Sequence, residues 1–205
     1  MNNKPVYTFN KEKHLHFING VQVPGPTTVF KAEGYINYPD TPGMKEAMYR
    51  GSYVHHACHL LNSNDLDENS VAQEYAGYIE AYKILLKDLH MPAVEASEEH
   101  VYSSTWMYAG ILDHISGDIL ADIKTSKQSS FWWPWQTAAY ALAWKEMTGK
   151  TIKKRIIIKL SAEGTYKIEE HKDKTDERTF LSILGNYKLK LKHGVYKLQG
   201  EDDDE

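Results

Sequence analysis

Apolar and polar residues alternate through the middle of the chain, which is the pattern of half-buried β-strands. This alternation, together with a β-branched stretch further on, predicts strands at about 94–105, 106–115, 118–124, 152–160 and 166–170. Ser116-Gly117-Asp118 is a tight-turn signal, so the second and third of these strands should form a β-hairpin. A separate hairpin is predicted over His14–Val23, with Asn19-Gly20 at its turn.

Elsewhere the apolar residues recur at the spacing of amphipathic helices. The predicted helices lie at about 28–34, 43–62, 70–89, 134–148 and 175–193. Thr175 is suited to cap the last of these helices, and Gly194 is suited to end it. Helices before and after a strand-rich centre predict a single α/β domain over residues 1–200, followed by a disordered acidic tail over residues 201–205.

Composition sets the class of protein. The chain has 205 residues, of which 41% are hydrophobic and 25% charged, as in a soluble globular protein. The single cysteine, Cys58, excludes an intramolecular disulfide and indicates a reducing compartment. No apolar run is long enough to span a bilayer, and the N-terminus has no hydrophobic signal region, so we expect a cytoplasmic protein without a membrane partner.

The formal net charge of −4 depends on the acidic tail. Without residues 201–205 the chain has 24 basic and 23 acidic residues. Basic residues gather in two stretches, first Lys145, Lys150, Lys153, Lys154, Arg155 and Lys159, and then Lys188, Lys190, Lys192 and Lys197. Local patches of this kind can attract phosphate whatever the total charge, although an ordinary solvated surface explains them equally well.

Three charged residues on the predicted hairpin suggest chemistry. Asp122 and Lys124 lie on one face of their strand because side chains alternate, and an antiparallel neighbour can bring Asp113 alongside. Magnesium and manganese prefer oxygen ligands and take few carboxylates from a protein. Asp113, Asp122 and the backbone carbonyl of Ile123 would suffice for such an ion. Lys124 would then orient or deprotonate the attacking water, or stabilise developing negative charge, and a plain surface ion pair is the alternative.

Four stretches along the chain, taken in order, resemble the RecB-like branch of the PD-(D/E)xK nuclease superfamily, above all its phage-type and mitochondrial genome maintenance exonucleases. The first stretch is similar to the family's "V-P-S-V-T" segment, although Gly25-Pro26 departs from it. The others are similar to the R-G-x-x-V-H helix, to the Asp and D-x-K strands, and to the Q-x-x-x-Y helix. The stretches are Val23–Phe30, Arg50–His55, Glu98 with Tyr108–Asp113 and Asp122–Ser126, and Gln136–Tyr140.

The resemblance implies a restriction-endonuclease-like fold, with a mixed β-sheet core flanked by helices and an N-terminal helical segment. It implies an exonuclease that uses Mg²⁺ or Mn²⁺ to cut DNA at single-stranded or free ends, in repair, recombination or replication, within a bacterial or phage-infected cell. By resemblance His55 and Glu98 join the metal ligands, although Glu99 competes with Glu98. Substrate contacts are expected from Arg50, Thr125, Gln136 and Tyr140.

The aromatic segment Phe131–Trp135 precedes the Q-x-x-x-Y helix. Such rings either pack over the core or stack on unpaired bases, and we expect the core to take most of them and one or two to be available for stacking. A catalytically inactive nucleic-acid-binding module with the same fold is the alternative function. Metal-dependent loss of labelled DNA ends would distinguish the two.

Overall fold

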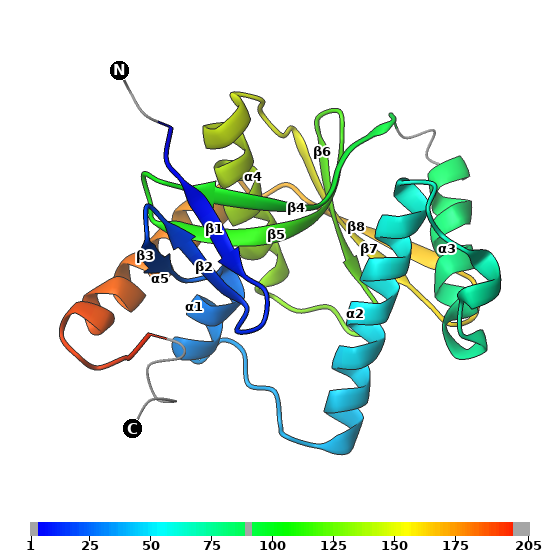
Figure 1. The fold of residues 1–205 in the computed structure, drawn as a ribbon, viewed down its shortest axis with the longest axis horizontal. Coiled ribbons are helices and arrows are strands. Elements are labelled where there is room, and N and C mark those ends of the chain that lie inside the picture. The colour runs from blue at the N-terminus through cyan, green and yellow to red at the C-terminus, as the bar shows by residue number, and fades with distance from the viewer. Residues whose placement is uncertain (1–3, 89–91, 199–205) are drawn as a thin grey trace.

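The computed structural model describes residues 4–88 and 92–198, which form two β-sheets and the helices around them (Figure 1). The chain starts with a three-stranded antiparallel sheet made of β1 (Tyr7–Asn10), β2 (Leu15–Ile18) and β3 (Val21–Val23). The predicted hairpin is confirmed as β2–β3, and both turn residues, Asn19 and Gly20, have positive φ. The sequence did not predict β1, which extends this hairpin by one strand.

Helices connect this small sheet to the large one. They are α1 (Pro26–Ala32), α2 (Pro42–Asn62), the 3₁₀ turn η1 (Glu68–Ser70) and α3 (Gln73–Asp88). The Thr41 side chain caps α2 by accepting a hydrogen bond from the Met44 N–H, and Pro42 occupies the first turn, where a missing N–H costs nothing. An N-terminal helical segment is thus present, but it follows a sheet instead of opening the domain.

The large sheet has five strands in the order β4-β5-β6-β7-β8. They are β4 (Val94–Ser103), β5 (Tyr108–Ser116), β6 (Ile119–Lys124), β7 (Lys154–Leu160) and β8 (Tyr166–His171). All neighbours are antiparallel except β6 and β7, which run parallel because α4 (Trp133–Thr148) crosses between them. The predicted mixed sheet flanked by helices is confirmed.

Two apolar cores lie on opposite faces of the large sheet. Helices α1, α4 and α5 (Asp176–Lys192) cover one face, and α2 and α3 cover the other, as Figure 1 shows. Strand β7 illustrates the alternation, because Ile157 belongs to the first core while Ile156 and Ile158 belong to the second. Among the helices that the structure describes, none is both long and apolar enough to cross a membrane. The predicted acidic tail over residues 201–205 lies outside the described residues.

Candidate metal centre

The β4–β5 ladder brings Glu98 opposite Asp113. Ser97 pairs with His114 and Glu99 pairs with Leu112, so the two carboxylates face each other between these pairs. Glu98 has a φ of 52°, which is unusual for a non-glycine residue inside a strand and costs about 1–3 kcal/mol. This local backbone turn breaks the alternation by which sequence alone would choose between Glu98 and Glu99.

Helix α2 contributes His55 from the edge of its buried face. Val54, Ala57 and Cys58 pack into the core beside the large sheet, which fixes how the helix presents His55. The His55 Nδ1 atom lies 3.2 Å from Asp113 Oδ1 and 3.6 Å from Glu98 Oε1. Ligand atoms of the three side chains all lie within 4.8 Å of one another. Two carboxylates and an imidazole on three different elements therefore form a cluster that could hold one metal ion.

A backbone group of strand β6 binds Asp113 Oδ2, the carboxylate oxygen that does not face His55. The backbone N–H of Ile123 donates a hydrogen bond of 2.6 Å to Asp113 Oδ2, which leaves Oδ1 directed at His55. The sequence predicted that the hairpin would bring Asp113 alongside the strand of Asp122 and Lys124, and it did not predict this hydrogen bond to the Ile123 N–H. Ligation by the Ile123 carbonyl remains a prediction.

The D-x-K residues form a second, connected group. Lys124 Nζ lies 2.6 Å from Asp122 Oδ2, as expected for residues on one face of a strand. Lys124 also donates a hydrogen bond of 3.4 Å to Gln136 Oε1 of α4, and Gln136 Nε2 donates one of 3.0 Å to the Tyr140 hydroxyl. Asp122 is 1% exposed, and its carboxylate pairs with the lysine and is not one of the three side chains that form the cluster of His55, Glu98 and Asp113.

Electrostatics make His55 a cation beside its carboxylates. Burial alone would lower the pKa of the imidazole, but attraction to Asp113 and hydrogen bonds with Asp113 and Glu98 raise it to about 10. Despite burial, the His55 and Lys124 cations and the Ile123 N–H hold the pKa of Asp113 below its usual value. A proton on His55 thus balances the acidic cluster, and a divalent cation held by the same side chains would take over that balance.

Lys124 is a fixed cation as well. Burial lowers the pKa of its amine, but the Asp122 and Asp113 carboxylates raise it by more, so the pKa is above its usual value. Burial raises the pKa of Asp122 to about 6, with the Lys124 ammonium opposing that rise and the Asp113 carboxylate adding to it. The ammonium therefore stays charged while it is held toward the cluster by Asp122 and Gln136.

The remaining predicted contacts lie at the rim of the site. Arg50 Nε, one turn before His55 on α2, donates a hydrogen bond of 3.4 Å to Thr125 Oγ1 at the end of β6. This contact ties α2 to the D-x-K strand, on which both Asp122 and Lys124 lie. The structure therefore brings every predicted site residue into one region of the molecule, and their functional roles stay predictions.

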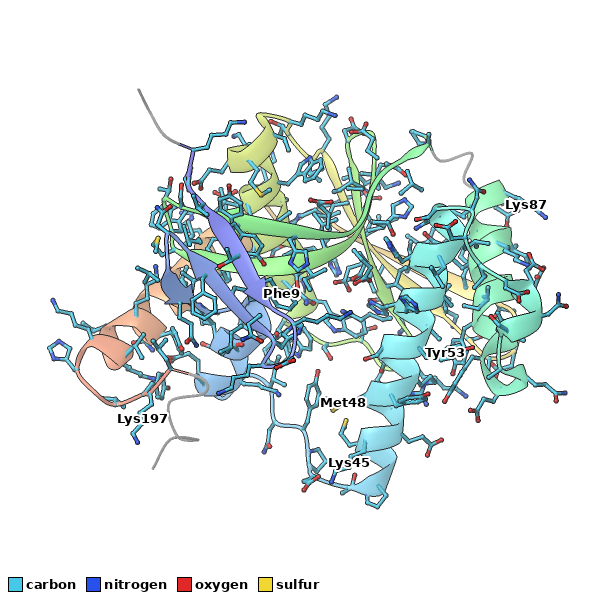
Figure 2. All side chains as sticks on the ribbon, in the orientation of Figure 1. Phe9, Lys45, Met48, Tyr53, Lys87 and Lys197 are labelled. Atoms are coloured by element: carbon cyan, nitrogen blue, oxygen red, sulfur yellow. The ribbon has the colours of Figure 1, made fainter. Side chains whose placement is uncertain are left out.

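Two hollows open on either side of the cluster. The first, of about 220 Å³, lies between the cluster and the small sheet, and residues of α1, Gly110 and Tyr140 also line it. The second, of about 600 Å³, lies between α2 and β1; Figure 2 shows Phe9, one of its lining residues, on the strand that faces the helix. His55 and Glu98 line both hollows. A substrate group could therefore reach the cluster from either side.

The wall opposite the cluster contains histidines that the sequence reading missed. The Tyr7 hydroxyl lies 2.7 Å from His16 Nδ1 and 2.9 Å from His100 Nδ1, joining the small sheet to β4. With only one proton, this hydroxyl can donate to one ring and must accept from the other. Burial, His14 and His100 lower the pKa of His16 to about 4. His100 lies 93 residues after Tyr7 in the chain, so no local motif marks this group.

The basic stretch after α4 is largely neutralised. Five of its six members form ion pairs: Lys150 with Glu95, Lys153 with Asp118, Lys154 with Glu170, Arg155 with Asp176, and Lys159 with Glu169. In the second stretch, Lys190 pairs with Glu33 at 2.7 Å. The first stretch therefore carries less free positive charge than its sequence suggested, because acidic side chains lie beside five of its members.

Comparison with known proteins identifies a solved structure with a similar fold. No protein-family model matches this chain, and no curated protein matches it in sequence. A similar structure is the crystal structure of a "putative exonuclease" from Eubacterium rectale, with a TM-score of 0.51 and 14% sequence identity. The match covers 86% of this chain and 77% of that chain. At this identity the likeness establishes a shared fold, and the conclusion is that the chain folds as that protein does.

Proposed function

We propose that this protein is a Mg²⁺- or Mn²⁺-dependent DNA exonuclease of the RecB-like PD-(D/E)xK branch, acting at single-stranded or free ends. The observation that carries the proposal is the meeting of His55, Glu98 and Asp113 within 4.8 Å, beside a lysine held by Asp122. The order of the four sequence motifs and the fold shared with the Eubacterium rectale protein support it. Cys58 is buried, and a reducing cytoplasm remains the proposed location.

The donor set fits a hard or borderline divalent cation. Two carboxylates supply oxygen ligands, and manganese in particular accepts an imidazole as well. Asp113, Glu98 and His55 would hold the ion, and Asp122 and the Ile123 carbonyl are the further ligands we propose. When bound, the cation would lower the pKa of a water molecule and neutralise charge on the phosphate.

The chain's own residues supply the remaining steps. Water oxygen attacks phosphorus, the bond from phosphorus to the leaving sugar oxygen breaks, and that oxygen takes up a proton from solvent. The proton lost by the water passes to solvent. Because its pKa is raised, Lys124 serves as a permanent cation that binds the attacking water or a phosphate oxygen, and this favours the electrostatic role over the base role.

The test is an end-labelled cleavage assay. Single- and double-stranded DNA carrying a label at the 5′ or the 3′ end would be incubated with Mg²⁺, Mn²⁺ or EDTA. We expect mononucleotides or short products to appear progressively, only with metal and only from protein with an intact Asp113. Tight binding of DNA without cleavage under any metal would instead establish the inactive binding module, and activity in EDTA would refute the metal mechanism.

A further inference from the structure

Four aromatic rings, three of them exposed and Trp135 partly buried, lie on or next to the α1–α2 and β6–α4 connections (Figure 1). We name this group the aromatic platform and define it as Tyr35, Tyr38, Phe131 and Trp135. Phe131 is 62% exposed and Tyr38 44% exposed. Large rings left in water at adjacent positions are costly unless they serve to bind something.

The rings are held in place by one another and by the core. Trp135 lies 5.4 Å from Tyr35 and 5.6 Å from Phe131 between ring centroids, with interplanar angles of 85° and 78°. Phe30, which is fully buried, contacts the other side of Trp135 at 6.0 Å. Each edge-to-face contact covers one ring face, but Phe131 remains 62% exposed, so part of this pre-positioned ring is available for stacking.

Trp132 and Trp133, which follow Phe131 in the chain, differ from it in burial. Both are buried in the main core, as the sequence expected for most rings of this segment. Packing alone therefore accounts for these two tryptophans and does not account for Phe131.

Positive charge accompanies the rings. Lys31 Nζ lies 5.8 Å from the centre of the Tyr38 ring, and Lys124 lies within electrostatic range of the Tyr38 hydroxyl. Burial raises the pKa of Tyr38, and the Lys124 ammonium opposes that rise, as expected for a phenol near the cation. Trp135 of the platform directly precedes Gln136, whose Oε1 accepts the 3.4 Å hydrogen bond from Lys124, so the platform adjoins the candidate metal centre.

We propose that the aromatic platform stacks on unpaired bases of a nucleic-acid strand whose phosphate lies at the Asp113 cluster. Alternating flat rings and cations match the alternation of bases and phosphates along a single strand. Paired bases in a duplex already stack on each other and cannot offer their faces to these rings. The inference rests on the proposed nuclease function and deepens it, because it makes single-stranded nucleic acid the preferred substrate.

The test compares two probes of equal backbone charge. One is a fluorescein-labelled oligothymidylate, and the other is an abasic oligonucleotide of the same length; both are titrated in Ca²⁺, where binding can be followed without turnover. We expect Phe131→Ala to weaken oligothymidylate binding by about tenfold or more and to leave abasic binding unchanged. Phe131→Trp should retain most of the affinity because it keeps a ring. Trp106→Ala removes another exposed ring, on the β4–β5 turn, and should change neither titration.

Each result has a defined meaning. If a folded Phe131→Ala variant loses affinity for both probes equally, or keeps its affinity for both, the stacking proposal is overturned. A change in oligomeric state on Phe131→Ala without a change in DNA binding would show that the platform joins two protein copies, and would also overturn it. Hydrolysis of bis(p-nitrophenyl) phosphate, which lacks bases, should be equal in wild type and Phe131→Ala. If the wild type hydrolyses no diester while the two probes are still discriminated, the nuclease proposal fails and the stacking surface stands.

Discussion

The first hollow has two walls, and the pKa of a histidine is raised on one wall and lowered on the other. On the cluster wall, His55 faces Asp113 and Glu98, and its pKa is raised to about 10. On the wall formed by the small sheet, His16 lies among Tyr7, His14 and His100, and burial first of all lowers its pKa to about 4. The same side chain is a cation on one wall and a neutral hydrogen-bonding group on the other.

The difference shows that neighbours decide what a histidine can do. His55 lies between two carboxylates, so its positive charge can be replaced by a metal ion without leaving the acids unpaired. Within residues 4–88 and 92–198, His16 forms no ion pair with a carboxylate, and it joins two sheets through the Tyr7 hydroxyl. One wall is therefore suited to bind a cation and the other to hold the hollow in shape. This comparison leads to four predictions.

Removing the shared carboxylate should have the largest effect. Asp113→Asn keeps a hydrogen-bond acceptor for the Ile123 N–H but removes the charge that both His55 and a cation need. We expect DNA cleavage to fall by at least about 10³-fold and calorimetric Mn²⁺ binding to be lost, with an unchanged circular dichroism spectrum. Wild-type turnover by this variant would show that the cluster wall is not catalytic.

Removing the fixed cation should have the next largest effect. Lys124→Met should lower kcat by about 10²–10³-fold because charge on the phosphate is no longer stabilised, while Mn²⁺ binding persists. Lys127→Met is the matched control, because Lys127 is 88% exposed and only 3.8 Å from Glu163 in a surface pair. Loss of Mn²⁺ binding in Lys124→Met would mean that the lysine positions the ligands instead.

Lowering the pH should lower the free energy of unfolding through His16, which lies on the wall formed by the small sheet. In the unfolded chain a histidine has a pKa of about 6.5, whereas His16 in the fold has about 4. Between these values the unfolded state binds more protons, so the stability that neutral His16 provides above pH of about 6.5 is lost as pH falls toward 4, by up to about 3 kcal/mol.

Denaturant titrations at several pH values would measure this dependence. His16→Gln cannot be protonated and should show a shallower loss of unfolding free energy over the same interval. His193→Gln, at the exposed end of α5, provides the control and should leave the slope as it is in the wild type. An identical slope in His16→Gln and wild type would show that His16 is not the group that titrates.

The smallest effect should come from crowding the hollow. A Cβ atom at Gly110 would lie 2.7 Å from Tyr140 Cε1 and 3.4 Å from Pro26 Cδ. Gly110→Ala must therefore shift the Tyr140 ring and loosen the contact from Tyr140 through Gln136 to Lys124, and we expect activity to fall by about tenfold. Gly185→Ala on α5, where nothing lies within 4 Å, should leave activity unchanged. If Gly110→Ala and Gly185→Ala cleave DNA at the same rate, Tyr140 does not contribute to catalysis.

The sequence by itself determined the elements and the chemistry they carry. Alternation and turn signals located every strand of the large sheet, and Asp122 and Lys124 lie on one face because this depends only on strand periodicity. The resemblance of short motifs proposed His55, Glu98 and Asp113 as metal ligands, with Glu99 as a competitor of Glu98. These features are local, so neighbouring residues suffice to encode them.

Tertiary structure decided what depends on distant partners. Glu98, which has a positive φ, lies in the cluster, whereas the sequence left Glu99 as a competing candidate. Folding paired the lysines after α4 with acids from other strands, and it brought Tyr38 near Lys124. The charge of His55 was likewise set by burial and by carboxylates tens of residues away, and that of His16 by burial, by nearby His14 and by distant His100. Desolvation and Coulomb interaction act through space, and for that reason no pattern along the chain could specify them.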